Sequence, residues 1–143
     1  MSDILHASDE LSRLIAQADR RLHVQLDALL REEGLPVEQW RVLDALADGQ
    51  GRAMTELSDQ VLINLSALSK MIDRMVSRAL IFRAPDQSDG RKVLVFISDR
   101  GLEIHRRIKP AVRERDASLQ RTFGKKNVVE LKRLLAALIE RTE

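Results

Sequence analysis

Residues 65–97 constrain the fold most, because within them the periodicity changes from helical to strand-like. Between Leu65 and Ala79, at about 100° per residue, apolar side chains fall on one side of a helix and polar side chains on the other. Asn64 is positioned to cap this helix. The apolar set is Leu65, Leu68, Ile72, Met75, Val76 and Ala79, and the polar set is Ser66, Lys70, Asp73, Arg74 and Ser77.

A β-hairpin is predicted directly after this helix. Leu80–Ala84 is short and apolar, and Arg91–Ile97 is rich in β-branched residues. Between them, residues 85–90 read Pro-Asp-Gln-Ser-Asp-Gly, which are turn formers. Two short strands around a polar tip containing glycine are typical of a hairpin.

The flanking segments are predicted to be helical. A long amphipathic pattern runs from Leu11 to Leu30 and ends at Gly34 and Pro36. Shorter helices follow around Trp40–Leu46 and at Met54–Val61, the latter with Thr55 as a candidate cap.

After the hairpin, Ser98 is a suitable N-cap for a helix that continues to Leu119. Pro110 lies inside this helix and is expected to kink or break it. A last helix follows Gly124. The resulting fold class is mainly α (α+β): a winged helix-turn-helix flanked by helices.

Composition excludes several classes of protein. The 143 residues suit one domain, and 44% hydrophobic with 32% charged residues is typical of a globular chain. No apolar run approaches the roughly 20 residues that span a bilayer, and the acidic N-terminal segment does not resemble a secretory signal. The absence of cysteine excludes disulfides and thiolate catalysis. We therefore expect a cytoplasmic protein with no membrane partner.

The net charge of +2 is unevenly distributed. Residues 1–51 carry five basic and ten acidic groups, a net charge of −5, whereas residues 101–143 carry eleven and six, a net charge of +5. Such asymmetry indicates that an anionic partner should be considered, although basic residues on helices usually form a solvated face.

Side chains suited to DNA lie on the polar face of the 65–79 helix. Ser66 and Ser69 could meet base edges or phosphates, and Lys70 and Arg74 are long enough to reach guanine or the backbone. This predicts a recognition helix in the major groove. The alternative is an ordinary amphipathic helix with a solvated outer face.

The hairpin tip provides a second candidate DNA contact. As a wing, it would insert Arg91 into the minor groove, with Asp89 orienting the guanidinium and Lys92 contacting a phosphate. The alternative is a solvated surface turn. The candidate wing residues are Gln87, Ser88, Asp89, Arg91 and Lys92.

Residues 68–101, LSKMIDRMVSRALIFRAPDQSDGRKVLVFISDRG, resemble the multiple-antibiotic-resistance regulator (MarR) family of bacterial transcription factors. The family's R-x-L-[IV]-x-R stretch, D-x-x-D-x-R wing and [LI]-[ST]-x-x-G strand end are all present, and Gln39–Leu43 is similar to its second helix. Ala79 departs from a glycine that often ends the recognition helix, a change expected to cost little if the residue stays helical. The matching residues are Arg78, Leu80, Ile81, Arg83, Asp86, Asp89, Arg91, Ile97, Ser98 and Gly101.

The two terminal helical regions are predicted to form an interface. Their apolar stripes, Leu11–Leu30 and Val128–Ile139, exceed what one small winged-helix core can cover. The resemblance implies that they interlock in an obligate homodimer, which places two recognition helices on successive major grooves of a pseudo-palindromic operator. The candidate interface residues are Leu5, Leu11, Leu14, Ile15, Leu131, Leu134, Leu135 and Leu138.

The resemblance also implies a single MarR-type domain over residues 1–143. Residues of about 36–100 would form the DNA-binding lobe, and about 5–33 and 101–143 the dimerisation helices. Family members often bind small anionic aromatic effectors in a cleft between these parts. The candidate lining residues are His23, Trp40, Arg41 and His105. The plainer interpretation makes Trp40 a core residue and the histidines helix-surface residues.

No catalytic motif accompanies these features in the sequence. It lacks a phosphate-binding glycine loop, an H-E-x-x-H motif and a nucleophile elbow, and His6, His23 and His105 lack metal-ligand spacing. We predict no enzyme activity, cofactor or metal. The leading hypothesis is a homodimeric repressor that binds specific double-stranded DNA and is released by an effector. The alternatives are a winged-helix protein–protein module and a non-specific architectural DNA binder.

Overall fold

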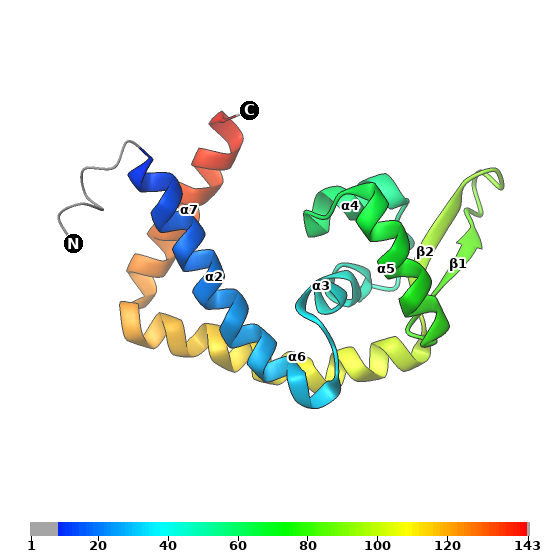
Figure 1. The fold of residues 1–143 in the computed structure, drawn as a ribbon, viewed down its shortest axis with the longest axis horizontal. Helices are drawn as coiled ribbons and strands as arrows, with labels where there is room; N and C mark the ends of the chain where they lie inside the picture. The colour runs from blue at the N-terminus through cyan, green and yellow to red at the C-terminus, as the bar shows by residue number, and fades with distance from the viewer. Residues whose placement is uncertain (1–8, 143) are drawn as a thin grey trace. The chain divides into compact units, whose positions relative to one another are not determined.

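The computed structural model describes residues 9–142 and divides the chain into two compact units, Met1–Arg107 and Ile108–Glu143. The first unit contains α2 (Glu10–Leu30), the 3-10 turn η1 (Arg31–Glu33), α3 (Val37–Leu46), α4 (Met54–Val61), α5 (Leu65–Ser77), β1 (Ile81–Pro85), β2 (Val93–Ile97) and the start of α6 (Asp99–Phe123) (Figure 1). The second contains the rest of α6 and α7 (Lys125–Arg141). A mainly helical chain with one small sheet confirms the predicted fold class.

The core of the first unit joins α3, α4, α5 and the hairpin. Leucines from α3, α4 and α5 are fully buried, together with the strand residues Ile81 and Val95. Only the C-terminal end of α2 contributes, through Leu26 and Leu30. Burying this much apolar surface fixes α5 against its neighbours and leaves its opposite face in solvent.

Local hydrogen bonds set the beginning of α4 and of α5. Asn64 caps α5 as predicted, its side-chain oxygen accepting the Ala67 N–H at 2.9 Å. The predicted Thr55 cap of α4 is wrong, because α4 begins at Met54 and Thr55 lies within its first turn. Instead, Glu56 accepts the backbone N–H of Ala53 at 3.3 Å, which satisfies a donor before the helix.

Ala79 ends α5 in a left-handed conformation, with a φ of 60°. The expectation that it stays helical is therefore wrong. The N–H of Ala79 bonds to the Val76 carbonyl at 2.9 Å and that of Leu80 to the Met75 carbonyl at 3.0 Å, which is a Schellman ending. Glycine adopts this backbone without the cost that a Cβ imposes.

The hairpin pairs Ile81 with Ile97 and Pro85 with Val93. Arg52, before α4, forms an isolated β-bridge with Val95. The Arg52 N–H donates to the Val95 carbonyl at 3.0 Å, and the Arg52 carbonyl accepts the Val95 N–H at 2.8 Å. This pairing ties the middle of β2 to the segment that leads into α4.

Ser98 caps α6 as predicted, accepting the Gly101 N–H at 3.0 Å. A Cβ at Gly101 would lie 2.1 Å from the Leu80 carbonyl oxygen, so only glycine allows this approach. Of the two expected effects of Pro110, a kink or a break, the break does not occur, since α6 continues to Phe123. Pro110 and Arg106 are exposed, so water can satisfy the Arg106 carbonyl that lacks a helical donor.

The second unit is helical and shows little burial. Residues 125–141 of α7 include none that is buried, although leucine and isoleucine recur along the helix. Among residues 9–142, no helix is long and apolar enough to cross a membrane.

Candidate nucleic-acid interface

The first part of the candidate interface is the outer face of α5. Leu68, Ile72 and Met75 are completely buried on its inner face. The four predicted DNA-contacting residues are all exposed, and they are Ser66, Ser69, Lys70 and Arg74. The helix therefore presents two hydroxyls and two cations on the side that its own unit leaves uncovered.

Two polar contacts orient α5 relative to the elements around it. Arg83 on β1 donates through Nη2 to Asp73 Oδ1 at 2.6 Å, and this contact joins the hairpin to α5. Arg78 Nη1 donates to Gln39 Oε1 at 3.2 Å, and the Gln39 side chain is buried in α3. Sequence analysis placed Asp73 on the polar face without identifying Arg83 as its partner. Asp73 is the one acidic residue of α5, and its ion pair with Arg83 balances this negative charge beside the exposed cations of the helix.

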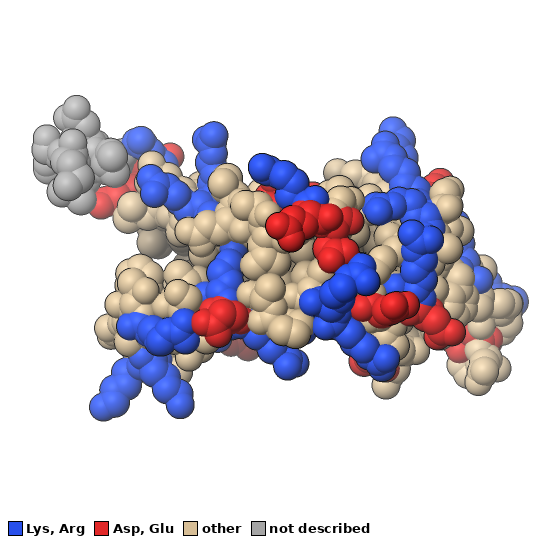
Figure 2. Space-filling view, turned by 90° about the horizontal axis from the view of Figure 1, so that it is seen from below, with Lys and Arg blue, Asp and Glu red and all other residues tan. Residues whose placement is uncertain are grey.

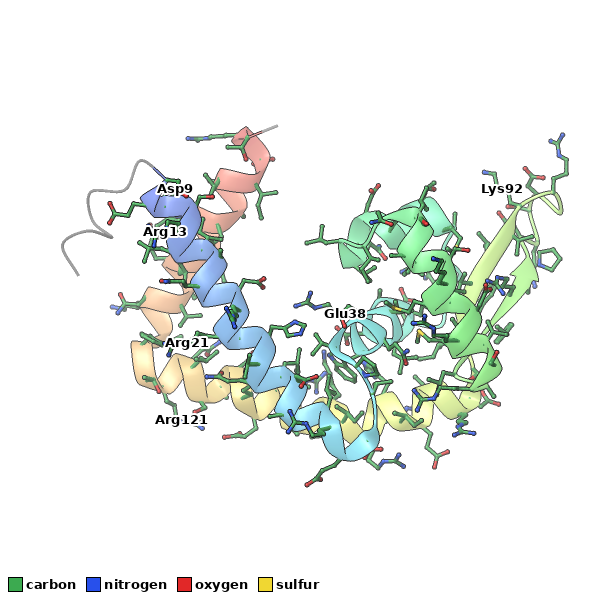
Figure 3. The ribbon with its side chains drawn as sticks, viewed as in Figure 1. Asp9, Arg13, Arg21, Glu38, Lys92 and Arg121 are labelled. Carbon is green, nitrogen blue, oxygen red and sulfur yellow. The ribbon has the colours of Figure 1, made fainter. Side chains whose placement is uncertain are left out.

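The hairpin tip is ordered by its own side chains. Asp86 Oδ1 accepts both the backbone N–H and the hydroxyl of Ser88, at 3.1 and 3.0 Å. The Asp86 N–H donates to the Lys92 carbonyl at 2.9 Å. Lys92 lies at this tip with its ammonium in solvent (Figure 3). Gln87 and Ser88 are exposed there as well.

Arg91 in the predicted wing is almost fully exposed. Its side chain is 94% exposed, while Asp89 Oδ1 accepts its backbone N–H at 3.1 Å and lies 3.4 Å from Nε. A single long contact from the carboxylate leaves the two terminal nitrogens of the guanidinium available to a partner. An exposed pair of this kind contributes little to stability, so its value lies in orientation.

Arg52 supports the middle of β2 through its bridge to Val95, a role that no sequence pattern indicated. Its guanidinium donates to Asp48 Oδ2 at 2.6 Å and to the carbonyls of Gln50 and Gly51 at 3.1 and 3.3 Å. The Gln50 N–H and Arg52 together lower the pKa of Asp48 below its ordinary value. Arg52 is therefore a structural cation rather than a candidate DNA contact.

Surface charge by itself does not identify the interface. Figure 2 shows Lys and Arg mixed with Asp and Glu over one face of the molecule. The features that distinguish α5 and the wing are the exposure of particular side chains and their attachment to a rigid core.

The candidate effector residues are only partly brought together. His105 is 8% exposed, so the interpretation of it as a helix-surface residue is wrong. Its ring stacks on buried Trp40 with centroids 4.9 Å apart, and Nε2 lies 2.8 Å from Asp44 Oδ1. Trp40 is a core residue, as the plainer interpretation held.

The other two candidates lie outside this stack. Arg41 is half-buried and lines a small cavity of about 330 Å³ between α3 and α4, together with Asp44 and Gln60. His23 lies on α2 and is partly exposed. Burial of His105 depends on a residue 65 positions away in the chain, which sequence periodicity does not reveal.

The predicted dimer-interface residues are mostly exposed within one chain. They include Leu11, Leu14 and Ile15 on α2, and Leu131, Leu134 and Leu135 on α7. Leu138 is intermediate in burial, and Leu5 lies outside the described residues. Exposed leucine and isoleucine give each of these two helices an apolar surface that water solvates poorly.

Comparison with known proteins identifies the family. Residues 33–92 match the sequence model of the MarR family. The repressor IacR of Pseudomonas putida is 30% identical over 134 residues, which cover 90% of this chain and 78% of IacR. This relative is itself described as a helix-turn-helix transcriptional repressor.

Solved structures agree with the sequence match over nearly the whole chain. A structure of NadR in complex with 4-hydroxyphenylacetate superposes with a TM-score of 0.81 at 26% identity, covering 96% of each chain. A mutant of MarR from Escherichia coli complexed with operator DNA gives a TM-score of 0.80 at 26% identity, covering 90% of this chain and 92% of that one. The chain therefore belongs to the MarR family of DNA-binding transcriptional regulators.

Proposed function

We propose that the protein is a homodimeric repressor that binds a pseudo-palindromic operator through α5 and the wing. The observation that carries this proposal is the contrast within α5, where three fully buried residues anchor a face of exposed hydroxyls and cations. The MarR relative crystallised with operator DNA supports the same use of the fold. We place its action in the cytoplasm, where bacterial DNA is accessible.

In this proposal each part of the lobe has a separate task. Ser66, Ser69, Lys70 and Arg74 enter the major groove, where hydroxyls and cations match base edges and phosphates. Arg91 enters the adjacent minor groove, whose negative potential favours a guanidinium, and Lys92 contacts a phosphate. The ion pair between Arg83 and Asp73 keeps the helix and hairpin at a fixed orientation.

The dimer supplies the spacing between two such lobes. Exposed leucines on α2 and α7 are the surface that a second copy would cover. A two-fold axis then repeats the recognition helix about 34–36 Å away, one turn of DNA. The proposed organisation has residues of about 36–100 binding DNA, and about 5–33 and 101–143 dimerising.

The test begins with a selection of duplexes from a random library, followed by Arg91→Ala on the tightest duplex. We expect Arg91→Ala to weaken binding by about 1–3 kcal/mol. Arg106→Ala is the matched control, because Arg106 is exposed on α6 and belongs to neither α5 nor the wing. Unchanged affinity of Arg91→Ala would contradict the wing assignment. Equal binding to unrelated duplexes would favour an architectural DNA binder. If the protein binds no DNA at all, a protein–protein interaction module is favoured.

We extend the proposal to release by a small anionic aromatic compound, the class of molecule found in the NadR complex with 4-hydroxyphenylacetate. Trp40 is the only tryptophan, and it stacks on His105 beside the Arg41 cavity, so its fluorescence reports changes there. We expect 4-hydroxyphenylacetate to change this fluorescence and to weaken operator binding, because an effector must favour one dimer geometry. The uncharged amide of the same acid should do neither. Identical responses to both compounds would contradict recognition of an anion.

A further inference from the structure

Leu65, the first residue of α5, is unusually exposed for a leucine on the apolar side of its helix. It is 48% exposed, whereas Leu68, Ile72 and Met75 on the same helix are fully buried. The apolar stripe of α5 therefore extends beyond the core at the N-terminal end of the helix. This end is the part of a recognition helix that contacts base edges.

The backbone before Leu65 is held firmly. Leu62 ends α4 with a φ of 59°, and its N–H and that of Ile63 both bond to the Ser58 carbonyl. The Ser58 hydroxyl donates to the Ile63 carbonyl, and Asn64 caps the first turn of α5. Leu65 is thus presented to solvent from a fixed backbone rather than from a loose loop.

The residues of α5 next to Leu65 are polar, although Leu62 in the turn before the helix is also exposed. Ser66 follows it, and Ser69 lies one turn further along the same side of the helix. Both serines are exposed, as is Lys70. Within α5 itself, Leu65 is the single exposed leucine, flanked by hydroxyls and a cation, and this pattern suits the edge of a base better than an apolar protein partner. The pattern is complementary to thymine, whose major-groove edge carries a methyl group next to the O4 acceptor.

The geometry points to Leu65 as a specificity-determining residue that reads the C5 methyl of a thymine in each operator half-site. Ser69, four residues on, is placed to donate its hydroxyl to O4 of the same base. This inference rests on the proposed function, because it requires α5 to enter the major groove. It adds a residue that the family motif and the charge distribution do not indicate.

The test uses the tightest duplex from the random-library selection, with each thymine replaced in turn by deoxyuridine. The replacement removes only the methyl group. Burial of one methyl is worth about fourfold in affinity, so one substitution in a half-site should weaken wild-type binding by about fourfold. Substitution in both half-sites should weaken it by about sixteenfold, since distant effects combine independently.

Variants of Leu65 assign this discrimination to its side chain. Leu65→Ala should bind the thymine and deoxyuridine duplexes equally, and Leu65→Met, which keeps an apolar side chain, should retain the preference for thymine. Leu62→Ala is the matched control, because Leu62 is 85% exposed in the preceding turn but is not on the helix. Thermal unfolding of each variant, measured without DNA, shows whether the fold is intact.

Three results would overturn the inference. The wild type could bind every deoxyuridine duplex as tightly as the thymine duplex. Leu65→Ala could keep the full preference for thymine, or Leu62→Ala could abolish that preference. Lys70→Ala and Arg91→Ala distinguish these failures from failure of the proposed function. If these two variants still weaken binding to every duplex, α5 and the wing contact DNA and only the role of Leu65 is wrong.

Discussion

Two helices of this chain, α5 and α7, have similar amphipathic sequences but differ in whether their apolar side chains are buried. On α5, which packs against α4 and β1, Leu68, Ile72 and Met75 are completely buried. On α7, Leu131 and Leu134 are 55% and 51% exposed, and residues 125–141 include none that is buried. An apolar stripe therefore predicts that a helix will be covered, but it does not say whether the cover comes from the same chain.

Because of this difference in burial, the two helices gain their stability from different contacts. Each fully buried apolar side chain of α5 contributes about 1.5–3 kcal/mol to folding of the single chain. The leucines of α7 contribute at this scale only when another surface covers them. Under the proposed function that surface is a second copy, which makes the stability of this part depend on protein concentration.

The largest expected effect comes from placing a charge on α7. Leu134→Glu should weaken dimerisation by about 100-fold or more, because an unpaired carboxylate would be buried at the interface. Sedimentation equilibrium measures the change. Lys132→Glu is the control, since Lys132 is an exposed polar residue on the same helix. A Leu134→Glu protein that remains a dimer as stable as the wild type would refute the proposed role of α7.

Removing a buried side chain from α5 tests the other half of the comparison. Leu68→Ala should lower the free energy of unfolding by about 2–5 kcal/mol, through lost burial and the cavity it leaves. Leu62→Ala, at an exposed position, should change it by less than about 0.5 kcal/mol. Urea denaturation at one protein concentration measures both. Equal effects would show that burial within the lobe does not determine its stability.

A smaller effect is expected where α5 ends. Ala79→Gly should raise the free energy of unfolding by up to about 1 kcal/mol, because glycine adopts a φ of 60° without steric cost. Ala67→Gly, inside the same helix, should lower it by about 0.5–1 kcal/mol. If both substitutions destabilise the protein, Ala79 is not strained in solution.

The smallest effect concerns the ion pair that joins η1 to α6. Arg107 donates to both carboxylate oxygens of Glu33, at 3.0 and 2.8 Å, and lowers the pKa of Glu33. The ion pair therefore stabilises the folded protein at pH values above the ordinary glutamate pKa. This contribution is lost as the pH falls through the lowered pKa of Glu33. The free energy of unfolding, measured from neutral pH down through the lowered pKa of Glu33, should be smaller for Glu33→Gln than for the wild type at neutral pH. The two values should converge at low pH. A difference that is constant with pH would mean that the charge of Glu33 is not involved.

Local features of the fold could be predicted from sequence because neighbouring residues determine them. The cap at Asn64, the polar face of α5 and the turn at residues 85–90 all follow from short-range patterns. Thr55 was mistaken for a cap because it is the one residue near the start of α4 with a typical capping side chain, whereas the N-cap position is held by Ala53. Pro110 was expected to kink or break α6, yet its exposed surroundings allow the helix to continue past it.

Contacts between distant segments could not be predicted in this way. Arg83 with Asp73, Arg52 with the edge of β2, and His105 on Trp40 each require the folded arrangement before the partner is apparent. The left-handed backbone at Ala79 was missed because alanine gives no local signal for it. The polar residues of the candidate interface could be proposed from sequence, whereas the ion pairs that orient it needed the structure.

The most direct test of the account is the affinity of the dimer for the selected duplex, compared with the same duplex after both half-sites are scrambled, at one salt concentration. A sequence-specific regulator should bind the intact palindrome about 10³-fold or more tightly. Scrambling one half-site should remove much of this preference, because one of the two recognition helices loses its site. Equal affinity for the intact and scrambled duplexes would contradict the account.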